Sequence, residues 1–595
     1  MSRSPIDQKI DLLEIEVKVE GNPIDDSYRV MKMEIVNEVF KIPYAIIELL
    51  DGNAAEETFE ISSSEDFIPG KKVTINLGYH QETTEIFEGI IVNHRIKIGS
   101  NHPRLIIKCF DEAIKMTADR KSTYFLGMTD SDVMSKLIGD HSLSSSLDST
   151  SFQHKELIQY HSSDWDFLMT RAEVNGLLVY AENGEVFVKK PVLSGSADIS
   201  LTFGTDISKI DLDIDSGSQL KAVECSAWDP NTQKIVKSPS TEPSADDPGN
   251  ITGKKLSDVI SSTDFLLQTS GKLEDGMLKE WANARLLKSR LSRIRGTVSF
   301  LGVEGPKPNT LIELNGLGDR FNGNAFVSGV VHEISSGSWT TTAKIGLSPN
   351  WFSETKHDIS VPSASGVLPG IDGLHIGLVR NIHEDPDGEH RIKVDIPTIT
   401  ESGDGVWARM SHLYATNNAG SFFYPEIGDE VLLGFLNNDP RFPVILGKLY
   451  SQKNVPPFEA DDKNTHKAIV TNKQMKFVFD DDKIECWIET PAGNKLTFSD
   501  DQKSITMEDQ HGNKMVMDDS GIQIESPKDI SIKATGKMDL EATGAISIKS
   551  DQDVKMQGLN VEAKANVGFK AEGSASAELK ASGQTTVKGA IVMIN

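Results

Sequence analysis

The stretch HEDPDGEH (383–390) places two histidines and four carboxylates within eight residues. Such side chains bind metal ions when a loop brings them together. The centre of the stretch, Pro386–Asp387–Gly388, is also typical of a tight turn. A calcium loop would need to be longer and would close on a bidentate carboxylate. The sequence therefore favours a hairpin turn over a metal site.

Two further stretches have compositions that suggest chemistry. FDDDK (479–483) is an acidic run, and GLGDRFNG (316–323) is rich in glycine. The acidic run is typical of a solvated hairpin end. The glycine spacing fits neither the dinucleotide-binding pattern nor a phosphate loop, so turn glycines are favoured. The chain contains no GxSxG, HExxH or GxxxxGK[ST] pattern. We predict no catalytic, cofactor-binding or metal-binding residues, although a Ser, a His and an Asp from distant loops could still converge.

Composition limits the class of protein. The chain has 595 residues, too many for one core, and its length suggests roughly three to five domains. Its 61 basic and 88 acidic residues give a formal net charge of −27. This charge argues against nucleic acid or an anionic membrane as the main partner, because both favour clustered Lys and Arg.

The cysteines and the apolar runs bear on the compartment. Cys109, Cys225 and Cys486 lie far apart and form no CxxC pair. They are expected to be reduced thiols of a protein that folds in the cytosol. The N-terminal segment has no apolar core of signal-peptide length, and no stretch approaches the ~18 consecutive apolar residues of a membrane span. If the protein leaves the cell, we expect another machine to carry it.

The first part of the chain reads as short strands with a few helices. Residues 10–110 alternate apolar and polar side chains, as half-buried antiparallel strands do. Short helices are predicted at 131–139 and between a Ser163 cap and Gly176. The sequence AENGE (181–185) predicts a hairpin turn.

The segment 231–256 is rich in Ser, Pro, Asp and Gly and is predicted to be an exposed loop. A longer helix is predicted at 274–294, with Leu278 and Leu291 toward a core. Its Lys and Arg residues near the C-terminal end are expected on the exposed face, where cations suit the helix dipole.

Linkers divide the chain into expected domains. The segment between the two linkers has the size and turn content of one small β-barrel. The expected boundaries are 1–354 for an N-terminal region of two β-barrel-like subdomains, 355–372 for a linker, 373–450 for the barrel, 451–466 for a second linker, 467–521 for a neck of β-hairpins and 522–595 for a C-terminal needle.

The C-terminal segment repeats an eight-residue motif. In ISIKATGKMDLEATGAISIKS (530–550), ATG returns after eight residues and ISIK after sixteen. Alternate positions are apolar or small, and the others are mostly charged or hydroxylated, which predicts strands with one buried face. After Gly558 the alternation changes parity, which predicts a bulge or corner. The predicted core of the needle is Ile530, Ile532, Met538, Leu540, Ile546, Ile548, Val554 and Met556.

Each octad offers only two large apolar side chains, followed by two small residues. Such a unit cannot bury its face alone, and a monomeric solenoid needs about 20 residues or more per coil. The economical arrangement is several chains wound together, each supplying one face per octad. The roughly nine octads of 522–595 would make a shaft roughly 45 Å long at ~4.8 Å per stacked strand. An ordinary antiparallel meander and a flexible tail are the alternatives.

Longer motifs resemble a known family. Within 376–450, the stretches DPDGEHRIKV, VWARM, FYPEIGDEV and NDPRFPVILGKLY resemble the oligosaccharide/oligonucleotide-binding-like (OB) barrel of VgrG proteins, the spikes of bacterial type VI secretion systems. YHSSDWDFLMTRAEVNGLLVY (160–180) and GLGDRFNGNAFVSGVVH (316–332) resemble the phage-hub-like N-terminal part of that family. The stretch 493–526 resembles its approach to a β-helix.

The resemblance implies a mainly β fold: phage-hub-like β-barrel domains with a few helices, an OB-fold barrel and a C-terminal trimeric triple-stranded β-helix. It implies a membrane-puncturing spike at the tip of a contractile injection apparatus, similar to the hub plus cell-puncturing spike of contractile-tailed phages. Such a spike sits on the inner tube and delivers effectors when the sheath contracts. The implied location is the cytoplasm during assembly, followed by secretion or injection without a signal peptide.

The same resemblance implies the partners. They are two further copies in a homotrimer, a ring-forming (Hcp-like) tube protein, baseplate proteins, effectors, a PAAR-repeat protein at the tip and, transiently, the target membrane. The tip protein would bind Ala590, Ile591, Val592, Met593, Ile594 and Asn595.

Departures from relatives leave alternatives open. The phage spike carries a lysozyme domain between barrel and needle, and 451–466 has no room for one. Some phage needles hold a metal with histidines at the tip, whereas the last histidine here is His511. No appended toxin is expected after AIVMIN. The alternatives are the spike of an extracellular phage-like contractile injection particle, a lytic enzyme spike and a surface adhesin with a trimeric stalk.

Overall fold

The computed structural model describes residues 4–7, 12–80, 82–99, 102–246, 248–400 and 403–594. The chain forms two compact units, one ending at Leu449 and one beginning at Tyr450. Within the described residues, no helix is both long and apolar enough to cross a membrane.

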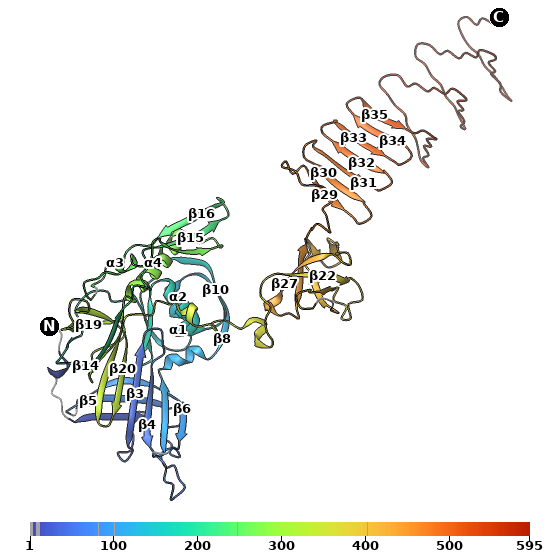
Figure 1. The fold of residues 1–595 in the computed structure, drawn as a ribbon. Coiled ribbons are helices and arrows are strands. Elements are labelled where there is room, and N and C mark those ends of the chain that lie inside the picture. Colours follow the sequence, from blue (N-terminus) through green and yellow to red (C-terminus); the bar gives the residue numbers. More distant parts are fainter. Residues whose placement is uncertain are drawn as a thin grey trace. The chain divides into compact units, whose positions relative to one another are not determined.

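One large sheet dominates the N-terminal unit (Figure 1). It joins thirteen strands of the described residues, and the hydrogen bonds between β3 and β20 connect its two halves. In order across the sheet, the strands are β14 (Ile207–Ile214), β18 (Ile294–Leu301), β21 (Ser338–Ile345), β20 (Gly323–Ser335), β3 (Val30–Glu38), β4 (Tyr44–Leu50), β7 (Arg104–Phe110), β6 (Glu82–Lys97), β5 (Lys72–Tyr79), β1 (Leu13–Val19) and β2 (Asn22–Pro23), with β19 (Thr310–Asn315) beside β20 and β13 (Ile199–Thr202) beside β19.

Each half of this sheet has its own hydrophobic core. The first half packs Phe67, Ile47 and Ile107 at its centre, and the second packs Phe300 and Ile312. Along β4, buried and partly buried side chains alternate, as expected for a strand with one face in the core. The alternating strands predicted for 10–110 are confirmed in the described part of that range.

A third core lies where two helices pack on short strands. Helix α1 (Asp130–Gly139) begins after Thr129, whose side chain forms a capping box with Asp132. Helix α2 (Asp164–Val174) begins after Ser163, whose hydroxyl accepts from the Asp166 N–H. Both predicted helices are confirmed. Around them lie β8 (Arg120–Thr129), β9 (Ser144–Leu147), β10 (Gln153–Ser163), β11 (Leu178–Glu182), β12 (Glu185–Lys189) and the 3₁₀ turn η2 (Glu112–Thr117). The 3₁₀ turn η1 (Pro5–Asp7) lies instead beside β13 and β18 of the large sheet.

The predicted hairpin turn of AENGE connects β11 and β12. Asn183 and Gly184 take positive φ angles of 52° and 79°. Two successive positive angles are what a two-residue hairpin loop requires, and Asn-Gly adopts them readily. This prediction is confirmed.

The loop prediction for 231–256 was wrong in part. Strand β16 (Lys234–Pro239) lies inside that range and pairs with β15 (Val223–Asp229), which also pairs with β17 (Phe265–Thr269). Val236 packs against the core beneath this sheet, so tertiary packing overrides the loop-like composition. The short helix α3 (Gly253–Ser257) also lies at the end of that range.

The long helix α4 (Asp275–Leu291) forms within the predicted range, but its cations are not exposed. Lys288 and Arg290 are buried, because acidic partners cover this side of the helix. Lys288 pairs with Glu173, and the Arg290 guanidinium donates to both carboxylate oxygens of Glu242 at 2.6 and 3.0 Å. The expectation of an exposed basic face is therefore corrected.

Residues 375–448 form the predicted small barrel. Five of its described strands close on themselves around a core that includes Val394, Leu433 and Ile445. The barrel strands are β22 (His375–Asn381), β23 (Ile392–Asp395), β24 (Val406–Met410), β28 (Pro443–Lys448) and β27 (Glu430–Phe435); the short elements η3 (Ser363–Gly366), β25 (Ala415–Thr416), β26 (Ala419–Gly420) and η4 (Leu436–Asn438) precede the barrel or lie within its range. Helix α5 (Phe352–Thr355) packs against α2 instead, where Phe352 contacts the third core.

The C-terminal unit contains a ladder of strands, each antiparallel to the next in sequence (Figure 1). We call β29–β35 the ladder. It begins one residue before and ends four residues after the expected neck, 467–521. Its strands are β29 (His466–Val470), β30 (Lys476–Asp480), β31 (Glu485–Glu489), β32 (Lys495–Ser499), β33 (Ser504–Glu508), β34 (Lys514–Asp518) and β35 (Gly521–Glu525).

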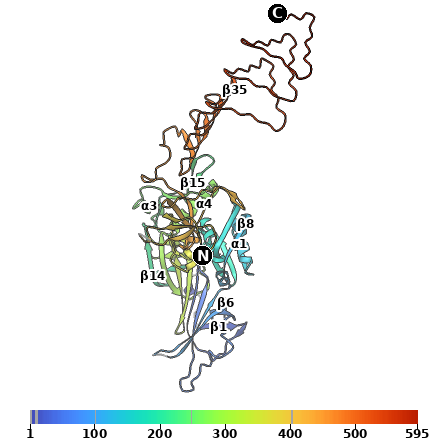
Figure 2. The same ribbon diagram turned by 90° about the vertical axis from the view of Figure 1, so that its right-hand side faces the viewer.

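Beyond the ladder, the chain runs as a series of open turns in both views (Figures 1 and 2). We call residues 526–594 the octad segment. All of them are described, and none belongs to a hydrogen-bonded strand. A strand exists only through pairing with a neighbour, and a single chain offers the octads none. The strands expected beyond 525 are therefore not formed within one chain.

Candidate functional site

The turn at 383–390 has its central carboxylate occupied by the chain itself. Asp385 accepts from the backbone N–H groups of Asp387, Glu389 and Arg391 at 3.2, 2.9 and 3.1 Å. The Arg391 guanidinium also donates to it at 2.6 Å. The hydrogen bond from Arg391 holds the pKa of Asp385 far below its ordinary value. The predicted hairpin turn is present, and among the described residues no group of three or more His, Cys, Asp or Glu side chains could hold a metal ion.

The other two suspect stretches are also turns. In FDDDK, the Asp480 carboxylate accepts from the N–H groups of Asp482 and Lys483 at 3.0 and 3.1 Å and so closes the β30–β31 hairpin. In GLGDRFNG, Gly316 and Gly318 take φ angles of 76° and 75°, which glycine adopts without strain.

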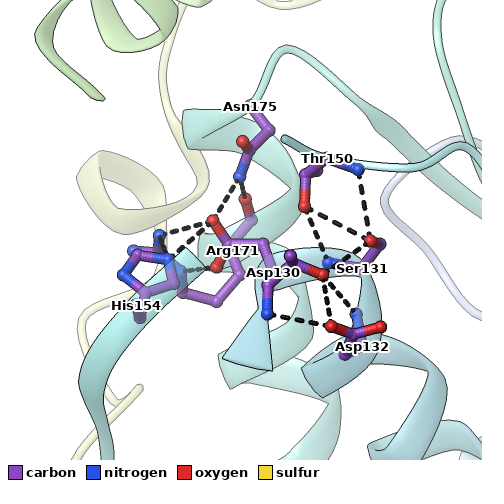
Figure 3. Close-up of polar contacts among 8 residues, drawn as sticks. Asp130, Ser131, Asp132, Thr150, His154, Arg171 and Asn175 are labelled. Atoms are coloured by element: carbon purple, nitrogen blue, oxygen red, sulfur yellow. Dashed lines mark hydrogen bonds and ion pairs between the residues drawn. The ribbon is translucent and has the colours of Figure 1, made fainter. Parts of the chain in front are cut away.

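The residue cluster that most resembles an active site was not found from the sequence. Figure 3 shows the buried Asp130 carboxylate at the start of α1 surrounded by donors. It accepts from Arg171 at 2.6 and 2.9 Å, from Asn175 at 2.9 Å, and lies 3.0 Å from Nε2 of His154. No sequence motif indicates the cluster, because its members come from α1, β10 and the C-terminal end of α2.

This cluster is built to hold elements together. Burial raises the pKa of Asp130, but the hydrogen bond and charge of Arg171 outweigh it and leave the pKa below its ordinary value. The neighbouring Ser131 exchanges hydrogen bonds with Thr150 (Figure 3). Every polar group named here is engaged with another of the cluster, which is the pattern of a satisfied buried network.

A large exposed apolar surface lies on the ladder. On one face of the ladder, the residues that lie directly opposite one another on neighbouring strands are nearly all apolar. Ten of these side chains are 37% to 68% exposed in the single chain. The whole set of thirteen residues is called the ladder's apolar face: Ile469, Phe477, Phe479, Cys486, Ile488, Leu496, Phe498, Ile505, Met507, Met515, Met517, Ile522 and Ile524.

The apolar surface continues from the ladder into the octads. A groove of about 740 Å³ is lined by Ile488, Leu496 and Met507 and, at its other end, by Ile524 and Ile530. Ile530 is the first large apolar residue of the predicted needle core. The apolar surface of the ladder therefore continues into the first octad.

The predicted needle core and tip are exposed in the single chain. The eight core side chains are 49% to 76% exposed: Ile530, Ile532, Met538, Leu540, Ile546, Ile548, Val554 and Met556. At the tip, Ala590 and the four residues that follow it up to Ile594 are exposed as well. Asn595 lies outside the described residues. The core and tip assignments remain predictions, since their burial would need further chains.

A family model described as the Alg8 N-terminal domain matches residues 9–336, more than half of the chain. The chain belongs to this family. Two further models match beyond that region of the Alg8-family chain. The type VI secretion system/phage-baseplate injector OB domain matches residues 375–450, and the phage baseplate V C-terminal trimerisation domain matches residues 485–595. The first coincides with the closed barrel, which confirms the OB-fold prediction, and the second covers β31–β35 and the octads.

VgrG proteins are among the relatives of the Alg8-family chain. The type VI secretion system spike protein VgrG3 of Vibrio cholerae is 31% identical over 114 residues, 17% of this chain and 11% of that protein. The spike protein VgrG1a of Pseudomonas aeruginosa is 42% identical over 60 residues, 10% of this chain and 9% of that protein. The resemblance found in the motifs is confirmed, and the matches span about a tenth of the length of these relatives.

Solved structures resemble the Alg8-family chain over longer stretches. One is the E. coli c3393 protein, described as a component of the type VI secretion system that is structurally similar to the T4 bacteriophage tail proteins gp27 and gp5. It is 14% identical, with a TM-score of 0.36, and the match covers 73% of this chain and 100% of that one.

Proposed function

We propose that three copies of the chain form the membrane-puncturing spike of a contractile injection apparatus of the VgrG kind. The observation that carries the proposal is the exposed apolar surface of the ladder and of the octads that follow it. A soluble protein that exposes so large an apolar surface uses it as an interface. A match to a trimerisation domain over residues 485–595 supports three copies as the occupants.

In this proposal the octads close around a common axis. Each octad would then bury two large apolar side chains per chain, at ~1.5–3 kcal/mol each before entropy costs. Strands from three chains would pair along the shaft and leave few free edges. Such a needle resists bending and shear, which puncturing requires.

The finer partners belong to the same proposal. The N-terminal unit would sit on a ring-forming Hcp-like tube protein and contact baseplate proteins. A PAAR-repeat protein would cover Ala590–Asn595, and effectors would travel with the spike. The chain would assemble in the cytoplasm, leave the cell when the sheath contracts and act mechanically, without catalysis. The names of the relatives VgrG3 and VgrG1a, which are both spike proteins, support the role as a spike.

A second candidate function is the spike of an extracellular phage-like injection particle. The description of the matched OB domain names phage baseplates beside type VI secretion, and the VgrG3 match covers only 17% of the chain. Fractionation of the producing cells separates the two. A spike that sediments with released particles supports the second candidate, and one that stays with the cell envelope supports the first.

The trimer is tested by the mass of the full-length protein, measured by light scattering after size exclusion. We expect about three times 65.2 kDa. The double variant I546D/I548D places charges on the proposed axis and should melt the trimer at a lower temperature and reduce effector delivery. S547D, which changes the polar residue between them, should leave both unchanged. A stable wild-type monomer would overturn the proposal.

A further inference from the structure

The octads before Gly558 by themselves specify the alignment of neighbouring chains weakly. Their exposure in the single chain repeats every eight residues: Ile530, Met538, Ile546 and Val554 are 49% to 56% exposed, and Ile532, Leu540, Ile548 and Met556 are 72% to 76% exposed. The successive octads of 530–557 therefore present nearly the same surface. Over this stretch a copy displaced by one octad would find nearly the same partners, and repetitive, small-residue strands are prone to such slippage.

The ladder's apolar face does not repeat in this way. Its bulk changes along the ladder, from Phe477 and Phe479 on β30 to Met515 and Met517 on β34. A copy displaced by one strand would bring the rings of Phe477 and Phe479 to the level of the smaller Ile488 and Cys486 on β31. Volume mismatches of this kind are destabilising, so one alignment is favoured.

The ladder is also set in register within its own chain. On the opposite face, a row of direct cross-strand neighbours alternates in charge along six strands, and opposite charges in such positions stabilise one pairing over its slipped alternatives. The row is Lys476, Glu489, Lys495, Glu508, Lys514 and Glu525. Each chain therefore carries a prefolded surface before it meets another.

We infer that the apolar face of β29–β35 is the surface on which copies of this chain dock and that it aligns the three chains before their octads interlock. The inference rests on the proposed trimer. A second copy is the occupant, because the face runs without interruption through the groove into Ile530 and because the matched trimerisation region begins at residue 485, inside the ladder. Strands β29 and β30 extend the surface beyond that match.

The test measures chain alignment in the full-length protein. Ser547 is replaced by a spin-labelled cysteine in a Cys486→Ala background; Cys109 and Cys225 stay in place, since burial raises the pKa of both thiols to about 12 and keeps them unreactive. Pulsed electron–electron distance measurement on the trimer should then give one interchain distance. Two matched double variants are compared. L496Q/M507Q changes a cross-strand pair on the apolar face. T497Q/T506Q changes the adjacent cross-strand pair on the opposite face of the ladder, the face that carries the charge row.

We expect L496Q/M507Q to give several distances or a mass below the trimer, and T497Q/T506Q to keep the single distance. Met507 is 56% exposed in one chain, so the apolar-face change leaves the ladder itself able to fold. A trimer of L496Q/M507Q with the single wild-type distance would overturn the inference, as would equal broadening in both variants. A monomeric wild type would instead remove the proposed function on which the inference rests.

Discussion

The indole N–H of Trp339 donates to Nδ1 of His332 at 3.2 Å, and both side chains are buried. The acceptor role requires the neutral imidazole with its proton on Nε2. Burial lowers the pKa of His332 to about 4 from its ordinary 6.5.

This pair predicts a loss of stability in acid. Between pH 6.5 and 4 the unfolded chain binds a proton at His332 and the folded chain does not, so stability is full above pH 6.5 and falls as the pH is lowered toward 4. The shift corresponds to roughly 3 kcal/mol. The asparagine of the variant H332N does not titrate. Between pH 6.5 and 4, the unfolding free energy of H332N should therefore fall by roughly 3 kcal/mol less than that of the wild type. Chemical denaturation at several pH values measures the difference, and parallel profiles for the two proteins would contradict the prediction.

The Asp130 network predicts a large loss of stability in one variant and its partial recovery in a second. R171M leaves the Asp130 carboxylate buried without its cation and should destabilise the region by roughly 3–5 kcal/mol. D130N/R171M removes the charge as well and should recover part of that loss. Amide hydrogen exchange of α2 measures both. Equal exchange in R171M and the wild type would mean that the ion pair contributes nothing.

Close packing against Trp339 predicts that Gly302 cannot be replaced. A Cβ at this position would lie 2.1 Å from Cδ2 of the indole ring, and the ring is held by His332. G302A should therefore lower the melting temperature, with a cost of about 1–3 kcal/mol or more. G276A, at a site in α4 with no heavy atom near the new Cβ, is the control and should be neutral or slightly stabilising. Thermal unfolding measures both melting temperatures, and equal values for G302A and G276A would contradict the prediction.

The charge row of the ladder predicts a salt-dependent effect. K495E places a carboxylate directly opposite both Glu489 and Glu508 and should destabilise β32 by about 1 kcal/mol. K473E makes the same change of charge at an exposed turn residue and should have little effect. Hydrogen exchange of the ladder amides reports the difference. High salt should restore part of the loss, and an effect indifferent to salt would mean that repulsion is not its cause.

Local signals in the sequence predicted the elements that depend on them. The cap at Ser163 lies three residues from the Asp166 N–H that it satisfies, and Asn183–Gly184 forms its turn from its own backbone preferences. The alternation of 10–110 follows from one face of each strand meeting a core. Such features can be read from a short window of residues.

Features that join distant residues could not be read in this way. Lys288 is buried because Glu173 lies beside it, and the two are 115 residues apart in the chain. Strand β16 has the composition of a loop and is ordered by its pairing with β15. The Asp130 network draws on three elements at once. The octads are exposed in one chain, and only the proposed contacts with further chains would bury them.

The pairing of β3 with β20 also has a consequence for biosynthesis. Glu38 lies opposite Gly329, so one edge of β3 stays open until the chain beyond Gly329 has left the ribosome. At ~5–20 residues translated per second, roughly 15–60 s pass between the synthesis of β3 and that of β20. An open strand edge is a template for pairing with other nascent chains, and charged side chains discourage it. Lys32, Glu34 and Glu38 lie along β3, where they can protect the half-made sheet while it waits.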